Sequence, residues 1–78
     1  MKMEGWKIMG SDLEILEDKE SNLRGEILAV RSKETGRVAA WKWKVFHFEE
    51  KVMEGLCNFY ADAHEKSEEI IANLQRAY

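Results

Sequence analysis

The tetrapeptide Trp41-Lys42-Trp43-Lys44 is the part of the sequence whose residue types could best bind a ligand. Sheet proteins that bind nucleic acids stack bases on aromatic rings and hold phosphates with cations. Successive side chains of a strand point to opposite faces, so the two Trp share one face and the two Lys share the other. A stacking surface needs both kinds on one side. The pattern therefore favours buried tryptophans over a binding platform.

Charge is unevenly distributed around these lysines. The segment 24–44 has a net charge of +4, whereas 1–23 and 45–78 have −3 and −4. A basic hairpin could neutralise the phosphates of a nucleic acid, although the overall charge of −3 opposes this. Equally, the basic middle can pair with the acidic flanks inside the fold. The candidate contacts for an anionic partner are Arg24, Arg31, Lys33, Arg37, Lys42 and Lys44.

The two histidines offer only a fragment of a metal or catalytic site. His47 and His64 each have carboxylates nearby at helical spacing. A zinc ion takes three or four protein ligands, and a nucleophile needs a base beside it. No Ser or Cys is placed beside either His by its spacing. We therefore expect no metal, no cofactor and no catalytic residue, and predict that the protein is not an enzyme.

Cysteine usage and the N-terminal segment indicate a compartment. Cys57 is the only cysteine, so no disulfide forms within the chain, and it lies among apolar residues where a small buried side chain is expected. Residues 1–10 lack the apolar region of a secretion signal, and no apolar run is long enough to span a bilayer. These features predict a cytoplasmic protein that does not contact membranes.

The elements that would position these residues begin with a hairpin. The segments 25–31 and 37–46 are rich in Val, Ile, Trp and Phe, and the polar segment 32–36 between them ends in a glycine. Upstream, 5–9 and 13–17 are shorter apolar-polar runs separated by a turn at 10–12. The sequence therefore predicts an antiparallel meander of three or four strands.

From position 47 the apolar pattern changes to a helical period. Phe48, Val52 and Leu56 recur four residues apart, and further apolar residues continue the stripe to Leu74. We predict one amphipathic helix over 47–77, either continuous or broken near Ser67. A helix over 48–76 alone would extend about 43 Å, well beyond a seven-residue strand of about 23 Å. The excess predicts contact with another chain.

The predicted fold is α+β, a single domain over 1–78 with the sheet in 1–46 and the helix in 47–77. The first helical stripe would cover the Trp face of the sheet. A second stripe would form an interface, and its residues are Met53, Cys57, Tyr60, Ile71, Leu74 and Tyr78. We therefore expect a non-enzymatic interaction module that forms a homo-oligomer, with a homodimer as its simplest form, or that binds a larger protein as an adaptor or inhibitor. The alternative is a nucleic-acid-binding protein that uses the hairpin 24–44.

Overall fold

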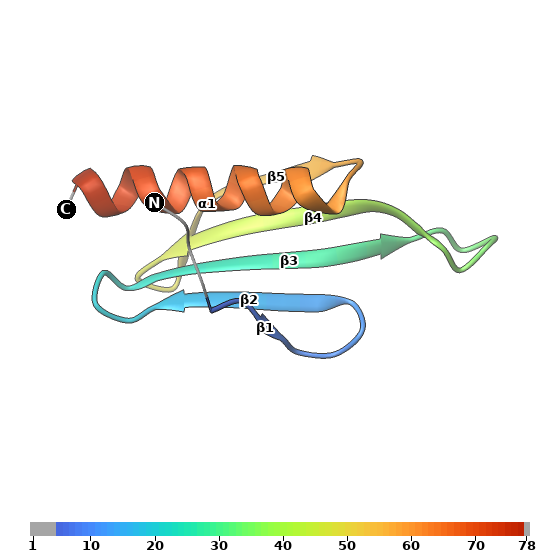
Figure 1. Ribbon diagram of the computed structural model, residues 1–78, viewed down its shortest axis with the longest axis horizontal. Helices are drawn as coiled ribbons and strands as arrows, with labels where there is room; N and C mark the ends of the chain where they lie inside the picture. The colour runs from blue at the N-terminus through green and yellow to red at the C-terminus, as the bar shows by residue number, and fades with distance from the viewer. Residues whose placement is uncertain (1–4, 78) are drawn as a thin grey trace.

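The computed structural model describes residues 5–77 as a five-stranded antiparallel sheet followed by one helix (Figure 1). The strand order in the sheet is the order in the chain. The strands are β1 Lys7–Ile8, β2 Leu13–Asp18, β3 Leu23–Arg31, β4 Val38–His47 and β5 Glu50–Cys57, and the helix is α1 Tyr60–Ala77. The α+β meander is confirmed, with one strand more than expected.

The central hairpin forms where the sequence predicts it. β3 pairs with β4 so that Ile27 lies opposite Trp43 and Gly25 opposite Val45. In the connecting turn, the amide of Gly36 donates to the carbonyl of Ser32 at 2.9 Å. Gly36 has a φ of 74°, which a residue without a Cβ adopts at little cost.

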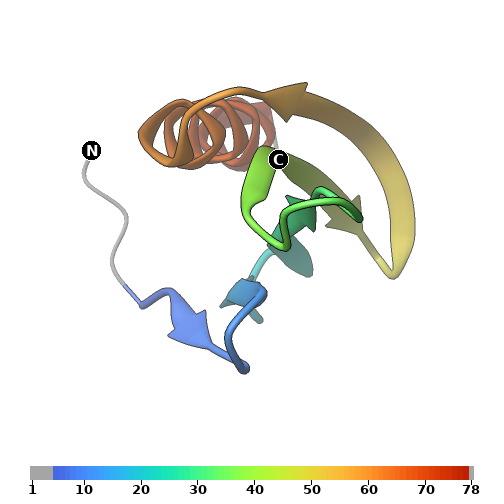
Figure 2. The same ribbon diagram turned by 90° about the vertical axis from the view of Figure 1, so that its right-hand side faces the viewer.

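The helix lies in the hollow of a curled sheet (Figure 2). Trp43 and Val45 are buried beneath it, as the alternation along β4 predicts, and Ile27 and Ile71 complete the centre of the core. Trp41 is partly buried against the same cluster. Because the one helix covers the concave face, no second layer covers the convex face of the sheet within residues 5–77.

The prediction of a helix from 47 to 59 is wrong, because Glu50–Cys57 forms strand β5 instead. Phe48, Val52 and Leu56 are four residues apart, a spacing that keeps them on one face in a helix and in a strand alike. Gly55 decides between the two. It lies opposite Trp43, and a Cβ there would come within 2.6 Å of the Trp43 ring.

The helix does not break at Ser67, which is fully buried inside the continuous helix α1. Its hydroxyl donates to the carbonyl of Ala63 at 2.8 Å, so it satisfies its own polar group within the helix. Eighteen residues give a helix of about 27 Å, close to the length of β4. The helix is therefore no longer than β4, and the length argument for a partner no longer holds.

Apolar residues that were expected to bury the sheet from a helix are exposed as a consequence. Phe48, Leu56 and Phe59 have exposed fractions of 66%, 64% and 69%, because they belong to β5 and its flanking turns rather than to a helix. Ile8 on the short edge strand β1 is 76% exposed. The apolar residues expected to cover the sheet are thus themselves on the surface.

Candidate interaction surface

The convex face of the sheet is built from cross-strand rows. Leu28, Lys42 and Leu56 lie side by side on β3, β4 and β5, and Glu26, Lys44 and Glu54 form the adjacent row. Opposite residues in an antiparallel pair share a face and interact directly. The convex face therefore alternates between a row with apolar ends and a row with acidic ends, each with a lysine on β4.

The basic side chains of the convex face have acidic neighbours. Lys42 Nζ is 3.9 Å from Glu54 Oε1, and this pairing together with Lys51 holds the pKa of Glu54 below its ordinary value, with the Lys51 hydrogen bond as the main cause. Arg24 contacts Glu26 at 3.1 Å and Glu49 at 3.3 Å, and its guanidinium stacks over Phe46. The positive charges on this face that were candidates for binding an anion are therefore largely neutralised by neighbouring carboxylates.

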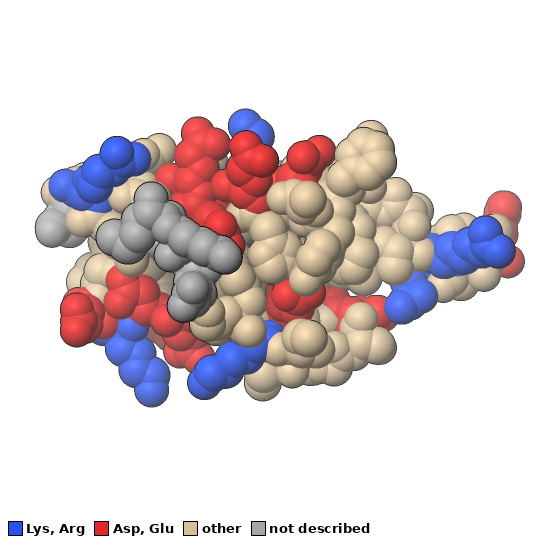
Figure 3. All heavy atoms as spheres, in the orientation of Figure 1, with Lys and Arg blue, Asp and Glu red and all other residues tan. Residues whose placement is uncertain are grey.

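The remaining candidate cations are at the tip of the β3–β4 hairpin, so the six basic residues do not form one patch. Arg31 donates to Asp12 at 2.8 Å, which lowers the pKa of that carboxyl through the hydrogen bond. Lys33 and Arg37 make no ion pair with the residues in 5–77. Figure 3 shows this hairpin at the right, with acidic atoms beside the basic ones.

The outer edge of β5 is the most apolar exposed part of the molecule. Six of the nine large apolar side chains exposed within 5–77 lie between positions 48 and 60, namely Phe48, Val52, Met53, Leu56, Phe59 and Tyr60. β5 pairs with β4 on one side and is the last strand of the sheet. Its other side therefore leaves backbone donors and acceptors for another strand.

The six residues predicted as one interface lie in different parts of the structure. Met53 and Cys57 are on β5, and Tyr60 begins α1, so they do not continue one helical stripe. Ile71 is only 2% exposed and belongs to the core, which removes it from any interface. Leu74 is partly buried against the same core. Tyr78 lies outside the described residues.

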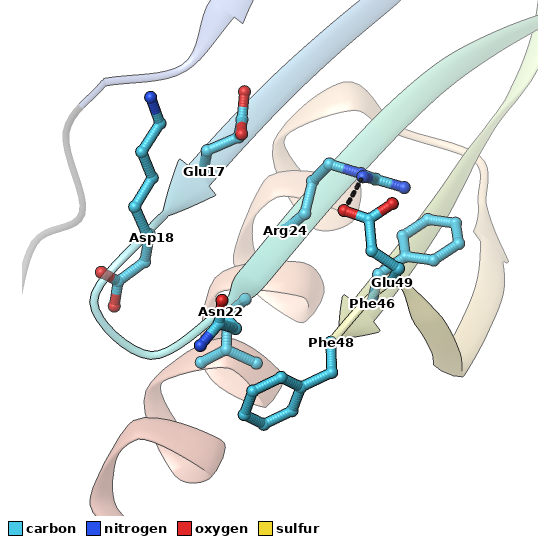
Figure 4. A pocket seen from close by; sticks show the side chains of 9 residues that line it. Glu17, Asp18, Asn22, Arg24, Phe46, Phe48 and Glu49 are labelled. Atoms are coloured by element: carbon cyan, nitrogen blue, oxygen red, sulfur yellow. Dashed lines mark hydrogen bonds and ion pairs between the residues drawn. The ribbon is translucent and has the colours of Figure 1, made fainter.

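A hollow of about 350 Å³ lies at the end of the convex face, between the β2–β3 and β4–β5 turns (Figure 4). Glu17, Arg24 and Phe46 line it from neighbouring strands, with Phe48 and Glu49 at the turn. Phe48 and Glu49 have φ values of 52° and 67°, a left-handed conformation that bulky residues rarely adopt. The amide of Phe48 donates to the carbonyl of Asn22 at 2.9 Å and joins the two turns.

A polar cluster on the concave side was not foreseen from the sequence. The ring of His64 lies against those of Trp6 and Tyr60, with centroids 4.7 and 4.5 Å apart. Its Nε2 is 3.3 Å from Glu14 Oε1, without the alignment of a hydrogen bond. The spacing of His64 and Glu68 was visible in the sequence, but their contacts with Trp6 and Glu14 cross more than 45 positions.

This cluster fastens the N-terminal segment and β2 to the helix. Trp6 Nε1–H donates to Glu68 Oε2 at 2.7 Å, and the Tyr60 hydroxyl donates to Glu14 Oε2 at 2.5 Å. Limited burial and the carboxylate of Glu14 raise the pKa of Tyr60 to about 12. The indole of Trp6 and the hydroxyl of Tyr60 are thus hydrogen-bonded, whereas the buried Nε2 of His64 has no hydrogen bond and only the 3.3 Å contact with Glu14.

Residues 5–77 contain no group of three or more His, Cys, Asp or Glu side chains placed to hold a metal ion. In the same range no helix is long and apolar enough to cross a membrane.

Comparison with known proteins gives no match to a family model, a curated protein or a solved structure. Function is therefore inferred from the geometry alone.

Proposed function

We propose that this protein is a non-enzymatic interaction module that binds other protein chains through β5 and the adjoining convex face. The observation that carries the proposal is the concentration of exposed apolar side chains at 48–60, on the edge strand β5 and in the segments that flank it. Exposed apolar side chains gathered in one region of a small domain usually mark an interface. The single unpaired cysteine, Cys57, agrees with a place in the reducing cytoplasm.

The patch combines two means of recognition. The free side of β5 offers backbone hydrogen bonds, and side chains on both sides of the strand offer apolar contact. The rows beside it carry charges of both signs, which suits a partner of mixed charge rather than a polyanion. An oligomer, or docking on a larger protein as an adaptor or inhibitor, would each use this surface.

Nucleic-acid binding through 24–44 is the weaker alternative. It needs uncompensated cations close together, whereas Arg24 and Lys42 have acidic neighbours and Arg31 is bound to Asp12. No feature of the described surface favours it over protein binding.

The test combines solution mass with capture from an extract of the native host. Light scattering across a tenfold concentration range shows self-association. Capture compares the wild-type chain with Leu56→Lys/Phe59→Ser, which changes two exposed side chains without touching the core. The proposal predicts self-association, or captured proteins that the variant loses. A strict monomer whose captured proteins are identical to those of the variant would refute it.

A further inference from the structure

We infer that the partner of β5 is β5 of a second copy, paired antiparallel so that two sheets join into one. This inference rests on the proposed function and names its partner. A two-fold axis perpendicular to the sheet relates two antiparallel edge strands, and such isologous contacts are the commonest route to dimers. Pairing would satisfy the backbone groups along the free side of both strands at once.

The first support is that β5 is apolar on both of its faces. Met53 lies opposite Val45, on the side of the core, and is 46% exposed, while Leu56 lies opposite Lys42 on the convex side. Both faces of β5 therefore carry exposed apolar side chains beside the unpaired backbone edge. Charges are a common protection of an edge strand, and β5 has three, Glu50, Lys51 and Glu54. They include both signs, so whether they protect the edge depends on the register in which two copies meet.

The second support is the charge pattern along the strand. Lys51 Nζ is 3.0 Å from Glu54 Oε1 within the chain. Antiparallel pairing about an axis close to Met53 sets the first half of each strand beside the second half of the other. Lys51 of one copy then comes near Glu54 of its partner, and the same attraction occurs twice. Parallel pairing would instead place like charges side by side.

The third support is the extent of the patch. Stable interfaces bury about 800 Å² on each partner, which one edge strand does not supply alone. Phe48 and Phe59 flank β5 at its two ends and are 66% and 69% exposed. In the antiparallel dimer, the Phe48 end of one strand lies at the Phe59 end of the other. The two aromatic side chains therefore extend the contact beyond the backbone ladder.

The charge pattern gives a test with two variants. Each should dimerise poorly alone, and a mixture of the two should dimerise again. Lys51→Glu leaves only acidic charges on β5, and Glu54→Lys leaves Glu50 beside two lysines, a net charge of +1. Each variant alone should dimerise at least about tenfold more weakly than the wild type, because like charges meet across the axis. An equimolar mixture should regain the dimer mass by light scattering. Weakening without recovery in the mixture would overturn antiparallel pairing at this position.

A matched pair of apolar substitutions locates the contact. Leu56→Lys places a charge on β5, and Ile8→Lys places one on the opposite edge strand β1, at similarly exposed positions. Leu56→Lys should weaken dimerisation about tenfold or more, while Ile8→Lys should leave it unchanged. Circular dichroism confirms that both variants fold. The reverse result would overturn the inference.

The outcomes also separate this inference from the proposed function. A dimer insensitive to the Lys51, Glu54 and Leu56 changes would overturn β5 pairing while leaving an interaction module in place. A wild-type monomer at millimolar concentration would likewise overturn self-pairing. The proposed function would then stand only if Leu56→Lys/Phe59→Ser loses a captured protein, and it fails if no such protein is found.

Discussion

The contact between Gly55 and the Trp43 ring favours a strand over a helix in this segment. The indole lies where a side chain on Gly55 would be, with ring atoms 2.6 Å from the position of a Cβ. A glycine in a strand often marks such a close approach. Trp43 is thus buried by β5 as well as by the helix.

Gly55→Ala should destabilise the protein by about 1–3 kcal/mol, because the added methyl overpacks the core against a rigid ring. In a helix the same change would stabilise by about 1 kcal/mol. The sign measured by urea unfolding therefore distinguishes the two structures. An increase in stability would contradict the strand.

Tyr60 gives a pH dependence of known sign. Its pKa is raised from 10.0 to about 12, by desolvation and by the Glu14 carboxylate that accepts its hydrogen bond. The folded state favours the protonated phenol, so this contribution to stability is complete below pH 10 and is lost as the pH rises towards 12. Tyr60 is 42% exposed, so solvent screening makes the contribution small.

Two measurements check the raised pKa of Tyr60 and its effect on stability. The absorbance titration of Tyr78→Phe, in which Tyr60 is the remaining tyrosine, should show a midpoint near 12. Tyr60→Phe keeps the ring but should remove this part of the alkaline loss of stability. A midpoint near 10 would show that the bond to Glu14 does not persist in solution.

At the scale of elements, the turn between β4 and β5 is the most strained connection described. His47 pairs with Glu50, so the hairpin loop has two residues, and both have positive φ. This geometry is normally supplied by Asn-Gly, whereas this chain has Phe48-Glu49. Left-handed conformations cost about 1–2 kcal/mol for an ordinary residue.

Replacing Phe48-Glu49 by Asn-Gly should therefore stabilise the chain by about 1–2 kcal/mol in urea unfolding. Ser-Ser at the same positions is the matched control, because it also removes both side chains but keeps the strain. If the control is as stable as Asn-Gly, the turn conformation does not carry the cost. Asn-Gly should also weaken dimerisation, since Phe48 extends the proposed contact.

The sequence predicted the hairpin 24–46 well and the segment 47–59 badly, for a physical reason. Alternation at Trp41, Trp43 and Val45 has a period of two and fits a strand alone. Phe48, Val52 and Leu56 fit both periods, and only the pairing with β4 decides between them. That pairing depends on Gly55 fitting the Trp43 ring, a contact between residues twelve apart that local propensity does not contain.

Of the six residues predicted as an interface, Met53 and Tyr60 lie among the exposed apolar side chains, although Met53 is on a strand and not on a helix. Cys57 is partly buried against the core. Ile71 belongs to the core, because the buried side of α1 carries Ala63, Ser67 and Ile71. Which side of the helix is buried depends on the packing of the whole chain.

At the scale of the whole molecule, acidic and basic side chains alternate on the convex face, and this bears on nucleic-acid binding. We expect no saturable binding of a single-stranded oligonucleotide at about 50 mM salt, because the convex-face cations are compensated. Fluorescence anisotropy at two salt concentrations measures it. The double variant Glu26→Gln/Glu54→Gln removes the carboxylates beside Arg24, Lys42 and Lys44. It should bind the oligonucleotide more tightly than the wild type. Salt-dependent wild-type binding that Lys42→Ala/Lys44→Ala weakens would contradict the prediction.

The neighbour-to-neighbour order of the strands has a consequence for synthesis on the ribosome. Each strand pairs with the one made just before it, so the sheet can assemble hairpin by hairpin as the chain emerges. The concave face with Trp41 and Trp43 has no cover until the final segment, Tyr60–Ala77, has been made. A nascent chain halted after β5 therefore presents its tryptophans to water, and is the form most exposed to chaperones and to aggregation.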